Sequence, residues 1–372
     1  MFIVCRRIMA RPPTQNAVRW LSIARAITLS IATLLAIAAH GASVTADPRP
    51  AWAVALERQL NAIDVNHSGE LGVYVKDLAT GATAGLRADE YWYIASGVKV
   101  PVAIAVLRNV ELGEFTLDTE VLLVETDYQG EASDNDWNKP GSRRAIRFLM
   151  EQMLSYGDNT ATDMLIRLIG LKQVNGVVRE LVPEGFGDIT TLADARRNVY
   201  SGFHPDAFRL TGKDFFLLEK HSDERRRLSS LASTLGVDAG ELILTDMDSA
   251  FAAYYATNLN GARLSAYGHL LEALLDGEAL GQQSTDYIID LMLKAEAGRN
   301  RLKAGLPASV AFAHKISTQH LRACDLGVAF HRNESTAPTV ITACTRGFAS
   351  MSDAEAALKA VGKAIHHSGV LD

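Results

Sequence analysis

Strand-like alternation of apolar and polar residues occurs near both ends of the chain, whereas the middle has helical periodicity, and this distribution constrains the fold most. The predicted strands are residues 71–76, 83–87, 310–317, 323–331 and 338–344. The predicted helices are residues 52–63, 96–112, 143–155, 160–169, 171–181, 206–235, 262–275, 284–294 and 353–366. Two early strands and three late ones predict an α+β fold, in which the two chain ends share one antiparallel sheet.

The first 46 residues look like a targeting segment. They carry five arginines and no acidic residue, and an apolar run at residues 26–39 is too short for a membrane-spanning helix. Val44-Thr45-Ala46 has small residues at the spacing of a signal-peptidase site before Asp47. We therefore predict a signal peptide at residues 1–46 and a periplasmic or secreted domain at 47–372. An uncleaved membrane anchor is the alternative.

The charge of the remaining chain limits its partners. Without the five N-terminal arginines, 32 basic and 43 acidic residues give a formal net charge of −11. A nucleic-acid partner would need a basic face for its phosphates, so we predict none. Contact with a membrane is expected only through the signal segment.

Two cysteines, Cys324 and Cys344, fall in the last two predicted strands, which a loop joins. If the turn centres on Glu334, they face each other across the strand pair, and export makes a disulfide feasible. A register shift of one residue would instead leave two buried thiols, and the sequence leaves both possibilities open. The chain has neither a C-x-x-C nor an H-E-x-x-H motif, so no metal site is predicted.

A serine and a lysine open the apolar helix predicted at residues 96–112. Ser96 and Lys99 are three residues apart, which places both side chains on one helix face. A serine hydroxyl needs a base to take its proton, and a partly buried lysine with a lowered pKa can do so. The alternative is a capping serine and a solvated lysine.

Two further motifs follow in order. Tyr156-Gly157-Asp158-Asn159 lies between two predicted helices, and His314-Lys315-Ile316-Ser317-Thr318 lies on a predicted strand. Together with Ser96-Gly97-Val98-Lys99 they resemble the motifs of class A β-lactamases and the wider penicillin-recognising serine hydrolases. The resemblance covers about residues 71–182 and 262 to the end. It implies a β-lactamase/transpeptidase-like fold, with a five-stranded antiparallel sheet flanked by helices and an all-helical subdomain.

The resemblance also implies roles for particular residues. Ser96 would be the acylated nucleophile and Lys99 its base. Asn159 would bind the substrate amide and Lys99, and Asp158 would order the turn behind it. Lys315 would supply a positive charge for a substrate carboxylate. The backbone N–H groups of Ser96 and Thr318 would form the oxyanion hole, and Ser317 would contact the substrate.

Several positions depart from the family pattern. Gly157 replaces the serine that helps protonate the leaving nitrogen, so Tyr156, Ser155, Ser317 or a water must act instead. Ile316 lacks the hydroxyl that contacts a substrate carboxylate.

The deacylation machinery departs as well. Residues 191–200 have Arg196 or Arg197 where the family carries the glutamate that activates water, and a guanidinium cannot act as a base. The nearest carboxylate is Asp194. His204 or Asp206 could activate water if their segment folds back over the site; a structural role for His204 is the alternative.

An insertion of about 58 residues, about 201–258, stands where the family has a short connection, and it is expected to form a lid or a partner surface. His314 is expected on the sheet face opposite Lys315. Arg322 is either a carboxylate ligand or an exposed turn residue.

The sequence therefore predicts an exported serine hydrolase that forms an acyl-enzyme at Ser96 and opens β-lactam rings. A peptidase, amidase or esterase of the same fold is the first alternative. The second is a degenerate module that binds β-lactams or peptidoglycan without turnover. The expected partner is a small β-lactam or peptide-like acyl substrate, and the chemistry requires no metal or organic cofactor.

Overall fold

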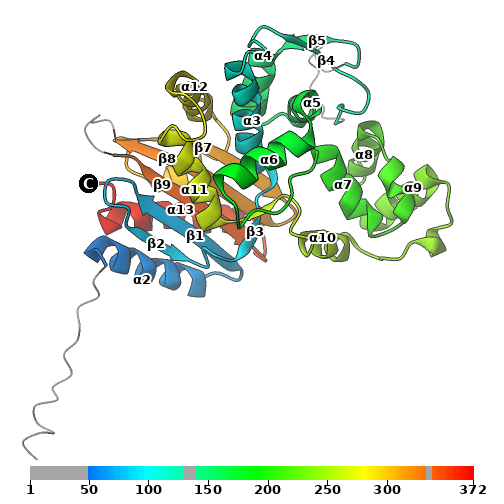
Figure 1. The fold of residues 1–372 in the computed structure, drawn as a ribbon. Helices are drawn as coiled ribbons and strands as arrows, with labels where there is room; N and C mark the ends of the chain where they lie inside the picture. The colour runs from blue at the N-terminus through cyan, green and yellow to red at the C-terminus, as the bar shows by residue number, and fades with distance from the viewer. Residues whose placement is uncertain (1–48, 130–138, 332–336) are drawn as a thin grey trace, which may run out of the picture. The chain divides into compact units, whose positions relative to one another are not determined.

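A computed structural model describes residues 49–129, 139–331 and 337–372 of the chain (Figure 1). The predicted signal peptide, residues 1–46, lies outside the described residues. Within them, no helix is long and apolar enough to cross a membrane.

One five-stranded antiparallel sheet takes strands from both ends of the chain, as the sequence predicts. In spatial order the strands are β2 (Thr83–Leu86), β1 (Glu70–Asp77), β9 (Thr339–Arg346), β8 (Arg322–His331) and β7 (Val310–Gln319). The N-terminal hairpin joins the three late strands through β1 and β9, which pair over eight residues. The strand β7 ends the sheet, so one of its edges is available to a neighbouring site.

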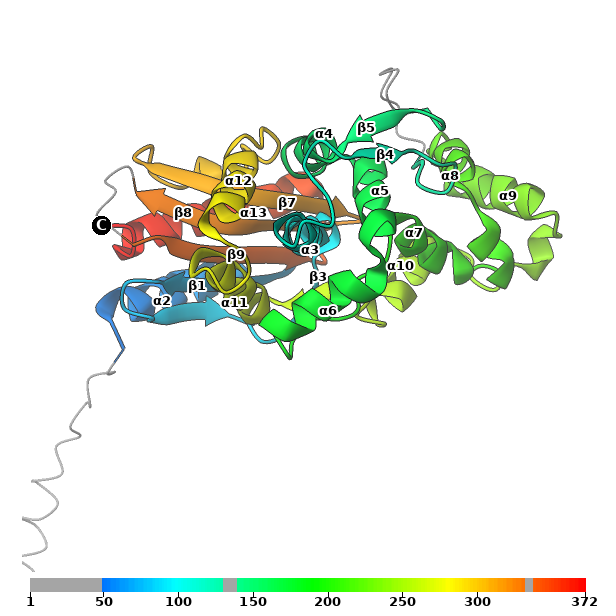
Figure 2. The same ribbon diagram turned by 45° about the horizontal axis from the view of Figure 1, so that its top comes forward.

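Helices cover both faces of this sheet (Figures 1 and 2). The terminal helices α2 (Ala51–Val65) and α13 (Met351–Ser368) share a hydrophobic cluster with one face. The other face packs against α11 (Leu264–Leu275), α12 (Gln282–Leu293) and the buried helix α3 (Lys99–Glu111). Because successive strand residues point to opposite faces, Phe312 joins the first cluster and Ala313 the second.

The middle of the chain is mostly helical. Its helices are α4 (Ile146–Glu151), a π-helical turn (Gln152–Tyr156), α5 (Asn159–Ile169), α6 (Leu171–Leu181), α7 (Leu192–Ser201), α8 (Gly212–Glu219), α9 (Glu224–Leu235) and α10 (Met247–Tyr255). Two small antiparallel pairs that the sequence did not predict are β3 (Tyr91–Tyr93) with β6 (Gly261–Arg263), and β4 (Glu120–Leu122) with β5 (Arg143–Ala145).

The single long helix predicted at residues 206–235 is wrong. The segment instead forms a 3₁₀ turn (Pro205–Arg209), α8 and α9. Thr211 caps α8 with a capping box, and the Asp223 side chain caps α9. These capping residues interrupt the charged, helix-like pattern. The segment therefore folds as several short helices, whose hydrophobic cluster also includes residues of α7 and the buried Tyr93.

The two cysteines of the late strands are bonded to each other. Cys324 and Cys344 are direct partners in the pairing of β8 and β9, and a disulfide joins them. The register thus settles the alternatives that the sequence left open. Both residues are buried in the cluster that also contains α3.

Candidate active site

Ser96 lies in a tight turn directly before a buried helix. It belongs to a 3₁₀ turn (Ala95–Val98), after which α3 begins at Lys99. Ala95 has a φ of 42°, in the left-handed region that residues with a Cβ seldom adopt. Such strain is retained where the surrounding structure enforces it, and it often accompanies functional residues.

Packing around Gly97 and Pro101 holds this turn in place. Pro101 lies in the first turn of α3. N–H groups in the first turn have no partner within the helix, so the missing N–H of the proline costs no hydrogen bond. The Gly97 carbonyl, four residues earlier, accepts a hydrogen bond of 2.8 Å from the buried Tyr267 hydroxyl. A Cβ on Gly97 would lie 2.7 Å from Leu326 Cδ1, so glycine lets the turn pack directly against β8.

Lys99 is fully buried one turn after Ser96. Its Nζ donates to the Gly157 carbonyl and to Asn159 Oδ1, the second over 2.7 Å. These two contacts fix the Lys99 amine beside the Asn159 side chain at the start of α5. The predicted contact between Lys99 and Asn159 is present.

The motif at residues 157–159 forms the start of α5. Gly157 has a φ of 80° and ends the preceding π-helical turn. Asp158 is the N-cap of α5, and its Oδ1 accepts from the Ala161 N–H over 2.6 Å. This geometry fits the ordering role expected of Asp158 and directs Asn159 toward Lys99.

Lys315 reaches the same place from β7. Burial lowers the pKa of Lys315 to about 7. The positive charge of the nearby Lys99 is the second largest cause, and Asp325 opposes the shift. A Cβ on Gly157 would lie 3.4 Å from Lys315 Nζ. The ammonium thus stands beside the space that the family's serine would occupy.

The next residues of β7 are held by Arg301, which the sequence did not single out. Its guanidinium donates to the Ser317 carbonyl over 2.8 Å and to Thr318 Oγ1 over 2.6 Å. Arg301 is buried and also pairs with Glu355 of α13. It therefore fixes the strand backbone that carries the Thr318 N–H.

His314 lies where the sequence predicts. It is fully buried, and its Nδ1 is 2.6 Å from Asp325 Oδ1. Its ring packs against Phe312, which belongs to the cluster on the α2 and α13 face.

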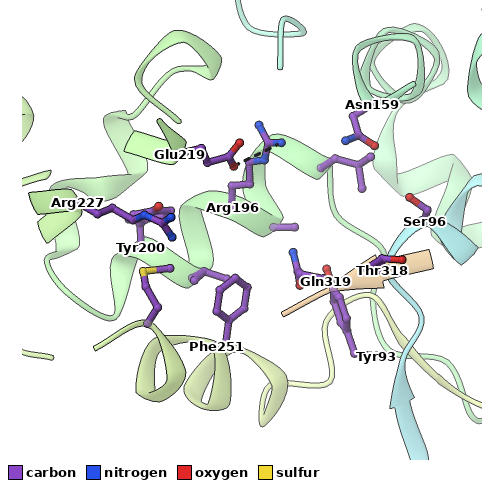
Figure 3. Close-up of a pocket in the computed structure, with 15 residues that line it drawn as sticks. Tyr93, Ser96, Asn159, Arg196, Tyr200, Glu219, Arg227, Phe251, Thr318 and Gln319 are labelled. Carbon is purple, nitrogen blue, oxygen red and sulfur yellow. Dashed lines mark ion pairs between the residues drawn. The ribbon is translucent and has the colours of Figure 1, made fainter. Parts of the chain in front are cut away.

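A cavity of about 250 Å³ opens beside Ser96 (Figure 3). Ser96, Asn159 and Thr318 line it together, although they come from three separate elements. Lys99 and Lys315 are buried behind this lining.

Three of the candidate residues around Gly157 are placed differently. Tyr156 is 69% exposed and does not line the cavity, so the structure does not bring it to the site. The Ser155 hydroxyl donates to the Leu291 carbonyl over 2.8 Å and is unavailable as a proton donor. Ser317 is buried and also lies outside the cavity lining.

The far wall of the cavity comes from α7 and the inserted helices. It consists of Arg196 and Tyr200 of α7, Glu219 of α8, Arg227 of α9, and Met247 and Phe251 of α10. Sequence reasoning missed Glu219, Arg227 and Phe251; the caps at Thr211 and Asp223 are the signals that would have placed α8 and α9.

The start of α7 is anchored by Asp163 of α5. This buried carboxylate accepts from the Leu192 and Ala193 N–H groups over 2.7 and 2.9 Å, and from Gln129 Nε2 over 2.7 Å. Burial raises the pKa of Asp163 to about 7. Arg196, one turn later, donates to the Gln129 carbonyl over 2.8 Å. Asp163 and Gln129 thus hold the helix that brings Arg196 to the cavity.

The water-activating residues considered from sequence lie away from Ser96. His204 Nδ1 accepts from the Asp206 N–H, and Asp206 pairs with Arg209, so both residues stabilise a local turn. Asp194 pairs with Arg197. None of them lines the cavity.

Arg322 likewise lies outside the lining: its guanidinium stacks 3.8 Å above the Tyr255 ring. Among the described residues, no group of three or more His, Cys, Asp or Glu side chains is arranged to hold a metal ion.

Comparison with known proteins agrees with this arrangement. A family model described as the β-lactamase enzyme family matches residues 55–368. The β-lactamase ROB-1 of Haemophilus influenzae is 30% identical over 164 residues, which are 41% of this chain and 53% of that protein. A β-lactamase of Streptomyces lavendulae is 33% identical over 117 residues, which are 30% of this chain and 38% of the relative. The chain thus matches about half, or less, of the length of these curated relatives.

Solved structures show the same fold. PBP-A is similar with a TM-score of 0.63 and 19% identity, over 86% of this chain and 97% of that one. A β-lactamase from Burkholderia vietnamiensis has a TM-score of 0.62 and 22% identity, over 84% and 95%.

Proposed function

Since the chain belongs to the β-lactamase enzyme family, we propose that it is a serine hydrolase whose Ser96 forms an acyl-enzyme with β-lactams. The observation that carries the proposal is the contact of Lys99 Nζ with Asn159 Oδ1, 2.7 Å, beside a cavity lined by Ser96, Asn159 and Thr318. A nucleophile, a buried amine and an amide side chain at one cavity make an acyl-transfer site.

In the proposed acylation step, Lys99 removes the proton of Ser96 while the oxygen attacks the ring carbonyl. The C–N bond of the ring then breaks, and the serine oxygen holds the acyl group. The backbone N–H groups of Ser96 and Thr318 stabilise the oxyanion; each such donor typically lowers the barrier by about 3 kcal/mol. Asn159 orients the substrate amide through its side chain.

The leaving nitrogen needs a proton, and we assign it to Lys315. The Ser155 hydroxyl is engaged elsewhere and Tyr156 is exposed, whereas Lys315 Nζ stands beside the space left by Gly157. A group with a pKa near 7 is well suited to proton transfer at neutral pH. A proton passed from Lys99 to Lys315 through solvent would restore both lysines.

A chromogenic cephalosporin and a penicillin test this function. The wild-type protein is expected to hydrolyse the cephalosporin and, when the reaction is quenched with acid during turnover, to carry the mass of the penicillin. Ser96→Ala should do neither. Circular dichroism of Ser96→Ala would verify its fold. Hydrolysis that persists in Ser96→Ala, or an adduct on another residue, would overturn the assignment.

A second candidate function is β-lactam binding with very slow release. Among the described residues that line the cavity, Glu219 is the only carboxylate, and it pairs with Arg196 over 3.7 Å in the far wall. A solved PBP-A variant is an acyl-enzyme complex with penicillin G. If deacylation is slow, cephalosporin hydrolysis begins with a burst equal to the enzyme concentration and the penicillin adduct persists for hours. Steady turnover without a burst would exclude this function.

We also propose that the protein is exported and acts in the periplasm or outside the cell, where it would protect against β-lactam antibiotics. The signal-like residues 1–46 and the Cys324–Cys344 disulfide support export. Mass spectrometry of the protein from a periplasmic fraction should find an N-terminus at Asp47. Protein retained in the cytoplasm with residues 1–46 attached would contradict this.

A further inference from the structure

The far wall of the Ser96 cavity offers a positively charged surface that the acylation chemistry does not use. We infer that this wall binds an anionic group, such as a carboxylate, on the acyl side chain of the substrate. The inference rests on the proposed function, because it assumes that the reacting carbonyl lies at Ser96. Figure 3 shows Ser96, Asn159 and Thr318 at one end of the cavity and Arg227, Tyr200 and Glu219 toward the other.

The charges on the lining residues favour an anion. Three of these residues are charged: Arg196, Arg227 and Glu219. Arg196 and Glu219 form an ion pair, so their charges cancel. Arg227 then gives these lining residues a net charge of +1. The two buried lysines next to the lining, Lys99 and Lys315, do not offset this positive charge. An entering carboxylate would therefore meet a cationic environment partly shielded from water.

Arg227 is placed to make the contact. Its Nε and Nη2 both donate to the His221 carbonyl, over 3.2 and 2.9 Å, so the guanidinium is fixed in orientation. The side chain is partly buried, and no carboxylate of the described residues pairs with it. Its Nη1 has no hydrogen-bond partner among those residues. A fixed guanidinium with remaining donors suits a carboxylate, which it binds through charge-assisted hydrogen bonds.

Aromatic and apolar side chains define the rest of this wall. Tyr200, Met247 and Phe251 line the cavity beside the arginines. Burial raises the pKa of Tyr200, and Arg227 is the strongest group that opposes the shift, so this phenol stays neutral next to the guanidinium. The surface therefore suits an acyl side chain with a flat or apolar body and one negative charge.

Three penicillins with matched side chains test the inference: benzylpenicillin, its α-carboxybenzyl analogue and its α-aminobenzyl analogue. They differ at one substituent, which is neutral, negative or positive. The rate of adduct formation on Ser96, followed by mass spectrometry, gives the acylation efficiency of each. We expect the carboxybenzyl compound to react about tenfold more efficiently than the aminobenzyl compound, the size typical of one hydrogen bond to a charged group.

Two variants on α9 distinguish a direct contact between Arg227 and the substrate carboxylate from a general electrostatic attraction by the positive charges of α9. Arg227→Gln should lower the ratio of carboxybenzyl to aminobenzyl efficiency about tenfold. Arg226→Gln removes the same charge from an exposed position outside the cavity lining and should keep the ratio within about twofold of the wild-type value. Equal effects of both variants, or a wild-type ratio near one, would overturn the inference while leaving Ser96 acylation intact.

A second pair of probes keeps the test valid if the protein ignores β-lactams. The 4-nitrophenyl esters of pentanoic acid and of glutaric acid differ by one terminal carboxylate. Ser96-dependent hydrolysis that favours the glutaric ester and loses this preference in Arg227→Gln would support the anionic subsite and reject the β-lactam proposal. No Ser96-dependent reaction with either set of probes would overturn both.

Discussion

The two walls of the cavity differ in how closely they follow the family pattern. The near wall, formed by the Ser96 turn, the start of α5 and the edge strand β7, contains Ser96, Asn159 and Thr318, with two buried lysines behind them. The far wall, formed by α7 to α10, has Arg196 in the region where the family carries its water-activating glutamate, and inserted helices supply the rest. Only the near wall carries the residues that we propose as nucleophile, ligand of the substrate amide and oxyanion donor.

This difference separates the two halves of a hydrolase cycle. Acylation needs a nucleophile, a base and oxyanion donors, and the near wall contains candidates for all of them. Deacylation needs an activated water. In the part of the far wall that the structure describes, the one carboxylate, Glu219, is already engaged by Arg196. We infer that the near wall sets whether the protein reacts, whereas the far wall sets what it reacts with and how long the adduct lasts.

The largest effect should come from removing the base in the near wall. Lys99→Met keeps the length and burial of the side chain but has no amine, so acylation should slow by about 10³-fold. Glu219→Gln, in the far wall, should change the acylation rate less than about tenfold. Rates of adduct formation with benzylpenicillin measure both, and thermal unfolding tests whether Lys99→Met remains folded. A larger effect of Glu219→Gln would reverse the division between the walls.

A smaller effect should appear in the pH dependence. Because burial and Lys99 lower the pKa of Lys315 to about 7, its positive charge is present below pH 7 and lost above it. Acylation efficiency should therefore fall as the pH rises through about 7. Stopped-flow measurements of the acylation rate between pH 5 and 10 would show this fall, the descending limb of the pH profile.

Lys315→Arg provides the control for that profile. An arginine stays charged throughout this range but cannot release a proton, so the variant should lose the limb near pH 7 and react about 10²-fold more slowly. A variant that equals the wild type at pH 6 and exceeds it at pH 9 would show that Lys315 supplies only charge.

The smallest effect should follow from restoring the family's serine. In Gly157→Ser the new hydroxyl would lie beside Lys315 Nζ, and acylation should gain less than about tenfold because Lys315 already supplies the proton. The left-handed backbone should cost about 1–2 kcal/mol of stability. Gly236→Ser, at another left-handed position with open space around it, should show the same loss of stability without a change in rate. A gain of 10²-fold or more in Gly157→Ser would contradict the proton-donor role of Lys315.

The sequence predicted the sheet because strand signals are local. Alternation and turn residues located all five strands to within a few residues. The helix predicted at residues 96–112 begins three residues later, because Ser96 lies in a 3₁₀ turn and α3 starts at Lys99. The signals were weaker in the insertion, where helix caps at Thr211 and Asp223 competed with a continuous charged pattern. The sequence pattern did not show how this segment divides into α8, α9 and α10.

Residue types and their order along the chain were thus sufficient to indicate the family, the five-stranded sheet and the candidate nucleophile with its lysine. Only the folded chain determined that Cys324 meets Cys344, that Lys315 stands beside Gly157, and that Arg227 and Glu219 share a cavity with Ser96. The physical reason is that periodicity and capping act over a few residues. Strand register and helix packing instead bring together side chains that are 20 residues apart, as in the disulfide, or more than one hundred, as in the cavity.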